Sequence, residues 1–172
     1  MATQKKRGKR SYLNDFEKSQ DGGYVYAGKT WHADAAVRRR ILVKLWALQA
    51  CMLLAALLPG FVTTAGLLNT FYVIIPYVFW LISDFVLAYT LGNVTFGGNP
   101  LRDYIYERSV KQYRTRTVFP LAGAALTAFA LLAFLLRGGS GEGEVVCFAC
   151  CGVQAAASFW AGRCKIADIW TE

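Results

Sequence analysis

Histidine is almost absent from this sequence of 172 residues, where His32 is the single one. A histidine-dependent nucleophile needs a serine or cysteine paired with the imidazole, and no such pair is evident near a membrane surface. A zinc site needs further ligands close to the histidine, and the chain has no zinc-ligand spacing. The sequence therefore predicts no hydrolytic or group-transfer chemistry, and we expect that the protein is not an enzyme.

Acidic residues are also scarce: 11 Asp and Glu stand against 19 Lys and Arg, which gives a formal net charge of +8. At the same time 55% of the residues are hydrophobic. A soluble domain of this size is rarely both so apolar and so basic, whereas membrane proteins combine apolar spans with basic cytoplasmic ends. The composition predicts one integral membrane domain, without a soluble module large enough to have its own core.

A cleavable secretory signal and a disulfide framework are two further features that we do not expect. The first apolar run begins near Ile41, after a long basic stretch, and Pro59 and Gly60 behind it do not form a small-residue cleavage site. Cysteines inside apolar runs are typical of packing between helices rather than of disulfides in a secreted protein. Cys164 lies just past an apolar run. The other four cysteines lie inside such runs: Cys51, Cys147, Cys150 and Cys151.

Long apolar runs are what the sequence has instead. A helix rises about 1.5 Å per residue, so each of these runs is long enough to cross a hydrocarbon layer of roughly 30 Å. The predicted fold class is an all-α membrane protein, an antiparallel bundle of four transmembrane helices within residues 40–162. The predicted spans are 40–58, 69–91, 118–136 and 145–162.

The remaining segments are polar or amphipathic. We expect a disordered basic cytoplasmic tail over 1–22, an interfacial segment over 23–39, a cytoplasmic loop over 92–117 and a short cytoplasmic end over 163–172. The partner expected for the basic segments is a bilayer with anionic headgroups. The tail has few aromatic residues and no recognisable nucleic-acid-binding module, so we expect no nucleic acid as partner.

Basic residues are distributed very unevenly between the two sides of the predicted bundle. They crowd the chain before residue 41, the segment 102–116 and the segment 163–165, whereas Arg137 stands alone on the other side. By the positive-inside rule both termini are cytoplasmic, an N-in and C-in arrangement. We expect a multi-pass protein of the cytoplasmic (inner) membrane of a bacterium.

The residues from Gly23 to Thr30 match the phosphate-loop motif of nucleotide-binding proteins, with Gly23, Gly28, Lys29 and Thr30 at its fixed positions. The pattern binds phosphate only between a buried strand and a helix, and the preceding residues 18–21 do not read as a buried strand. We therefore predict no nucleotide despite the match. Tyr24, Tyr26 and Trp31 instead favour a short extended or hairpin segment at the membrane interface.

Asp84 is an acid inside the second span, where a carboxylate is costly unless it is paired, protonated or facing a cavity. Counting depth from the cytoplasmic ends predicts that other polar side chains share its level. We expect Lys44 to pair with Asp84 as a structural clamp that fixes helix register. The alternative is a site that takes up and releases a proton. The predicted intramembrane polar cluster consists of Lys44, Gln49, Asp84, Gln154 and Ser158.

Cys147, Cys150 and Cys151 are the weak candidates for a metal site. Cys147 shares a helix face with each of the other two, and thiolates suit a soft metal such as copper(I). No histidine or methionine cluster accompanies them. We therefore predict no metal and no cofactor.

The predicted function follows from the membrane layout. We expect an accessory or scaffolding subunit without enzymatic activity, packing against a membrane-protein partner or as a homo-oligomer through small-residue helix faces. The alternative is a small proton-coupled transporter of a cation or amphiphile that uses Asp84.

Overall fold

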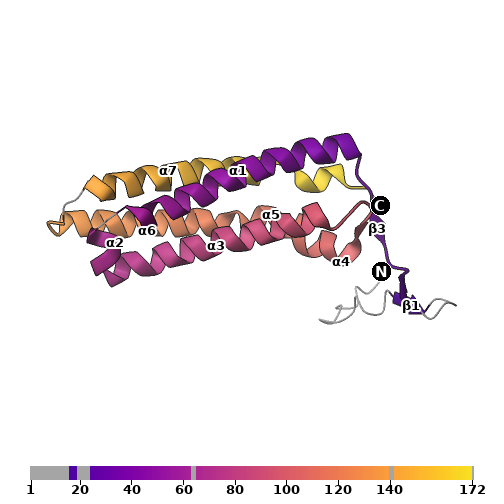
Figure 1. The fold of residues 1–172 in the computed structure, drawn as a ribbon, viewed down its shortest axis with the longest axis horizontal. Coiled ribbons are helices and arrows are strands. Elements are labelled where there is room, and N and C mark those ends of the chain that lie inside the picture. The colour runs from indigo at the N-terminus through magenta and orange to yellow at the C-terminus, as the bar shows by residue number, and fades with distance from the viewer. Residues whose placement is uncertain (1–15, 19–23, 63–64, 140–141, 172) are drawn as a thin grey trace, which may run out of the picture.

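The computed structural model describes residues 16–18, 24–62, 65–139 and 142–171. Four helices in this part of the chain are long and apolar enough to cross a membrane. They run antiparallel and pack together (Figure 1), so the predicted fold class is confirmed. These helices are α1 (Ala35–Phe61), α3 (Phe71–Phe96), α6 (Val118–Leu136) and α7 (Glu142–Arg163).

The order of the helices around the bundle decides which side chains can meet. Helix α1 packs against α7 and α3, and α6 packs against the same two helices. Helices α3 and α7 therefore lie diagonally opposite each other. A side chain that joins α3 to α7 has to cross the centre of the bundle.

Burial follows one stripe of each helix. On α1 the buried positions include Leu45, Gln49, Met52 and Ala56, which are spaced three or four residues apart as on one helix face. The outward faces carry large apolar side chains such as Phe129. This pattern suits a bundle with a packed interior and an apolar, lipid-compatible exterior.

Three of the four long helices are longer than their predicted spans, whereas α6 has the bounds that were predicted, 118–136. Helix α1 begins directly after Asp34, which caps its N-terminus. Asp34 Oδ1 accepts hydrogen bonds from the backbone N–H groups of Ala36 at 2.8 Å and Val37 at 3.2 Å. It also continues past Pro59 to Phe61. The predicted loop over 92–117 is largely helical. Its helical parts are the end of α3, α4 (Asp103–Ile105), the π-helical turn η2 (Tyr106–Val110) and α5 (Lys111–Arg116).

The short elements close the two ends of the bundle. Strand β1 (Phe16–Lys18) pairs with β2 (Tyr24–Tyr26), and β3 (Thr30–Trp31) pairs with β4 (Leu101–Arg102), both antiparallel. Helix α2 (Ala65–Asn69) precedes α3, and the 3₁₀ turn η3 (Ile166–Ile169) follows α7. Of the tail predicted to be disordered, residues 16–18 form β1, and residues 1–15 and 19–22 lie outside the described residues.

The segment around Trp31 docks on the bundle. The Trp31 ring stacks on Tyr106 at 3.9 Å between centroids, and its Nε1 donates to Asp103 Oδ1 at 2.9 Å. The backbone of His32 pairs with that of Thr171, which places the last described residue beside the segment that precedes α1 (Figure 1). We call this end of the bundle, built from residues 24–40, 94–117 and 163–171, the basic end.

Arg38 connects the start of α1 to the end of α3. Its Nη2 donates to the backbone carbonyls of Val94 at 3.0 Å and Thr95 at 3.1 Å. The last carbonyls of a helix have no partner within the helix and carry partial negative charge, so a guanidinium is a suitable donor for them.

Gly123 sets the closest approach between α6 and α3. A Cβ at this position would lie 2.7 Å from Trp80 Cα and 2.8 Å from Trp80 Cβ. Neither atom can move without shifting the backbone of α3. The small residue is therefore required by packing, as at close helix contacts in membranes.

We predict that Gly123→Ala lowers the free energy of unfolding by about 1–3 kcal/mol, the usual cost of overpacking. Gly92→Ala is the matched control, because Gly92 also lies inside a long helix and a Cβ there meets nothing within 4 Å. The control should be neutral or slightly stabilising. Unfolding of both variants in detergent would measure the difference, and equal stabilities would contradict the close α3–α6 contact.

Candidate functional site

Asp84 lies at the centre of the bundle with 0% of its surface exposed. Its Oδ1 accepts a hydrogen bond from Gln154 Nε2 at 3.0 Å. Asp84 belongs to α3 and Gln154 to α7, so this bond joins the two diagonal helices across the interior. Both side chains come from the buried stripe of their helix, and this common orientation brings them together.

Two more polar side chains complete the group. Gln49 of α1 donates from Nε2 to the backbone carbonyl of Asp84 at 3.2 Å. Gln154 Nε2 also lies 3.2 Å from Ser158 Oγ, and Ser158 donates to the Met52 sulfur at 3.3 Å. We call Gln49, Asp84, Gln154 and Ser158 the polar layer. Four of the five predicted cluster residues therefore meet, and they come from three helices.

Lys44 is the predicted member that the structure does not bring to the polar layer. Its side chain is exposed, whereas Asp84 is fully buried, so the expected Lys44–Asp84 ion pair is not formed. The reason is direction around the helix rather than depth. Each residue turns the helix by about 100°, so Lys44 points away from the stripe that holds Leu45 and Gln49. A lysine on this face can run its apolar stem along the helix towards the headgroups.

Helix α6 contributes Thr127 at the same interior face. Its side chain is fully buried, and its hydroxyl donates to the Gly123 carbonyl one turn earlier at 2.8 Å. The polar group of Thr127 is therefore satisfied within α6. The contacts that cross between helices come from the other three.

The polar layer holds more acceptors than donors. Three of its buried oxygens have no hydrogen-bond partner: Gln49 Oε1, Asp84 Oδ2 and Gln154 Oε1. The indole N–H of Trp80, one turn before Asp84 on α3, is also buried and unpartnered. A proton on Oδ2, or a bridging water, would supply donors to these oxygens. The layer can therefore hold a proton or a water molecule, or serve only as a hydrogen-bonded link between helices.

Apolar side chains close the polar layer on both sides along the bundle. Towards the basic end lie Leu45, Leu87 and Leu91, and towards the opposite end lie Ala56 and Trp80. The two hollows described at the basic end are not lined by Asp84. Among the described residues, the Asp84 side chain is fully buried in this conformation.

Glu144 is a buried acid that the sequence analysis placed in a loop. It is 1% exposed and lies in the first turn of α7. Its Oε1 accepts a hydrogen bond from the backbone N–H of Gly66 in α2 at 3.1 Å. This bond joins α7 to α2 at the end of the bundle opposite to the basic end. The signal that could have found it is an acid just before an apolar run, where the partial positive charge of a helix N-terminus favours it.

The three cysteines of the fourth span are buried in two places. Cys147 packs with Leu67 and Leu131, whereas Cys150 and Cys151 pack near Trp80. Within the described residues, no three His, Cys, Asp or Glu side chains are grouped so that they could hold a metal ion.

The stretch that matches the nucleotide-binding pattern runs from Gly23 to Thr30. Gly23 lies outside the described residues, and the structure describes 24–30. Thr30 and Trp31 form β3, an edge strand, and the next helix begins only at Ala35. The strand–loop–helix arrangement in which this pattern binds phosphate is therefore not formed here.

Comparisons of this chain with protein-family models, curated proteins and solved structures found no match. Inferences about function therefore depend on two properties of the molecule itself. One is the geometry of the polar layer, and the other is the charge of the basic end.

We predict that Gln154→Leu destabilises the bundle by about 1–3 kcal/mol, because it leaves both carboxyl oxygens of Asp84 buried without a partner. Lys44→Met is the control, and it should change the free energy of unfolding by less than about 0.5 kcal/mol, as is usual for an exposed position. Reversible unfolding in mixed micelles would give both values. A larger loss of unfolding free energy for Lys44→Met than for Gln154→Leu would support the Lys44–Asp84 ion pair and contradict the polar layer.

Proposed function

We propose that this protein is an accessory or scaffolding subunit without enzymatic activity, whose helices are fixed in register by the polar layer. The observation that supports this proposal is the complete burial of Asp84 and its bond to Gln154 across the bundle. A carboxyl that is enclosed and bonded between diagonal helices favours a structural role. A buried polar group of this kind can specify one arrangement of helices over others.

The outward face of α7 supports packing against another membrane protein or a second copy. Ala149, Gly152 and Ala156 are exposed and lie three and four residues apart, so they share one face. Small residues at this spacing allow another helix backbone to approach closely.

We also propose that both termini are cytoplasmic and that the membrane is the cytoplasmic membrane of a bacterium. The three segments 24–40, 94–117 and 163–171 all carry basic residues and lie together at the basic end (Figure 1). Arg137 follows the last residue of α6 at the opposite end and lies over the Tyr72 ring. Such an asymmetry favours the basic end on the cytoplasmic side.

A proton-coupled transporter of a cation or amphiphile is the second candidate. The unpartnered oxygens of Gln49, Asp84 and Gln154 favour it, because they could accept a proton or a cation. The apolar layers on both sides of Asp84 count against it, since transport needs alternating access to the site.

Asp84→Asn separates the two candidates. The amide keeps an oxygen for the Gln154 bond and adds an N–H for an unpartnered Gln oxygen, so we expect the stability and the assembly of native complexes to be kept. Proteoliposomes containing the wild type and Asp84→Asn, with a trapped pH-sensitive dye, should show the same proton leak as empty vesicles.

Asp84→Leu is the companion variant, because it removes the polar contact while keeping a side chain that branches at Cγ. It should lower the yield of folded protein and of the assembled complex. A wild-type proton flux above that of empty vesicles, lost in Asp84→Asn while the protein stays folded, would reject the scaffold and support the transporter.

A further inference from the structure

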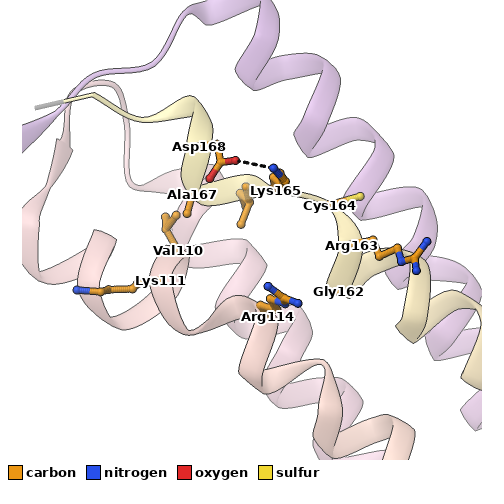
Figure 2. Close-up of a pocket in the computed structure, with 10 residues that line it drawn as sticks. Val110, Lys111, Arg114, Gly162, Arg163, Cys164, Lys165, Ala167 and Asp168 are labelled. Carbon is orange, nitrogen blue, oxygen red and sulfur yellow. Dashed lines mark ion pairs between the residues drawn. The ribbon is translucent and has the colours of Figure 1, made fainter.

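Two hollows meet at the basic end, between α5 and α6 on one side and α7 with η3 on the other. The first has a volume of about 490 Å³ and is rimmed by the basic side chains of Lys111, Arg114, Arg163 and Lys165. Figure 2 shows Arg114 on one wall and Lys165 on the facing wall. Figure 2 draws the charged ends of Lys111 and Arg163 directed away from this hollow, so Arg114 and Lys165 are the basic residues that face each other across it, from two distant stretches of the chain.

Some of these cations already have an acidic neighbour. Lys165 Nζ lies 3.5 Å from Asp168 Oδ2 (Figure 2), and Lys111 Nζ lies 3.0 Å from Glu107 Oε1. No ion pair with an acid is formed by Arg114 or Arg163 within the described residues. Arg163 instead lies over the Phe159 ring at 4.5 Å. The two arginines therefore retain N–H donors for an anion.

The second hollow continues from the first along α6 and α7. It has a volume of about 310 Å³ and shares Arg114, Gly162 and Arg163 with the first. Its apolar walls are Val118, Leu121 and Phe159. The hydroxyl side chains of Thr117 and Ser158 also line it, so the apolar surface lies on the side of these three residues. Leu121 lies seven residues past Arg114, about 10 Å further along the helix at 1.5 Å per residue. Val118 and Phe159 are exposed on the outward surface of the bundle, so this hollow opens towards the lipid.

From this juxtaposition we infer a binding site for an anionic phospholipid of the surrounding leaflet. The guanidinium groups of Arg114 and Arg163 bind the phosphate, as arginine does through parallel N–H donors. The apolar hollow beneath them holds the upper part of an acyl chain. A basic pocket between membrane helices at the headgroup level is suited to an acidic lipid headgroup. The inference does not rest on the scaffolding role, and neither hollow is lined by Asp84, although Ser158 of the polar layer lines the second one.

The shared chemistry is a phosphate ester, which a lipid headgroup and a soluble phosphate both offer. The apolar hollow distinguishes the two, because only a lipid has a chain to fill it. The lipid is favoured because the hollow that continues from the basic one opens on the outward face of α6 and α7.

The test is native mass spectrometry of the purified full chain with dioleoyl phosphatidylglycerol, dioleoyl phosphatidylcholine and glycerol phosphate. We expect phosphatidylglycerol to bind at least about tenfold more tightly than either of the other probes. Arg114→Gln combined with Arg163→Gln should weaken phosphatidylglycerol binding by about tenfold or more. Arg137→Gln is the matched control, because it also removes an arginine stacked on an aromatic ring, and it should leave binding within about twofold.

Leu121→Trp fills the apolar hollow while keeping both arginines, and it should weaken phosphatidylglycerol binding even if the double arginine variant folds poorly. Equal binding of the two lipids, or an equal loss in Arg137→Gln, would overturn the site. Glycerol phosphate binding as tightly as phosphatidylglycerol would show a soluble-phosphate site and overturn the lipid assignment. An unchanged affinity for phosphatidylglycerol in a folded Leu121→Trp variant would also overturn the lipid assignment.

Discussion

The hydrogen bond between Asp84 and Gln154 is the constraint on which the arrangement of the bundle depends. A bilayer offers no partner to a carboxyl group in its interior, so the partners have to come from other helices. Gln154 reaches Asp84 from the diagonal helix, and Gln49 reaches the backbone carbonyl of the same residue from α1. A shift of α7 along α3 by one residue would break this contact and leave buried oxygens without donors. In the scaffold that we propose, the polar layer specifies the register of three helices, whereas the apolar contacts around it tolerate more variation.

Polar contacts at three depths join helices of the bundle in pairs. At the basic end Arg38 joins α1 to the carbonyl end of α3, and in the middle Asp84 joins α3 to α7. At the opposite end Glu144 joins α7 to α2, next to the start of α3. Gly123 adds a close contact between α6 and Trp80 of α3. Helix α3 takes part in the first two of these contacts, and its Tyr77 also donates to the Ala56 carbonyl of α1 at 2.9 Å. These contacts suit a rigid body that presents its outer faces to lipid or to another protein.

The depth of a side chain along its helix was predictable from the sequence, whereas its direction around the helix was missed for Lys44. The apolar runs gave the four spans, and counting along them placed Gln49, Asp84, Gln154 and Ser158 at one level. Lys44 was placed wrongly beside Asp84 because depth alone ignores the direction of a side chain around the helix. The spacing of Leu42, Leu45 and Gln49 contains that information, since these residues form one stripe that excludes position 44.

Features that depend on distant residues were not predictable in the same way. The partner of Trp31 is Asp103, 72 residues further along the chain, and no local pattern connects them. The helical path through 103–116 depends on packing against other elements, since its many basic residues alone read as a loop. The basic residues around Arg114 and Arg163 were visible only as a signal of orientation. Their meeting above an apolar hollow required the folded structure.

A double-mutant cycle between Asp84 and Gln154 tests the central claim most directly. The free energy of unfolding would be measured for the wild type, Asp84→Ala, Gln154→Ala and the double variant, with an Asp84 and Lys44 cycle as reference. The polar layer predicts a coupling energy of about 1 kcal/mol or more for Asp84 with Gln154, and a value near zero for Asp84 with Lys44. A coupling near zero for Asp84 with Gln154, or a larger coupling to Lys44, would contradict the claim that this bond across the bundle fixes its helices.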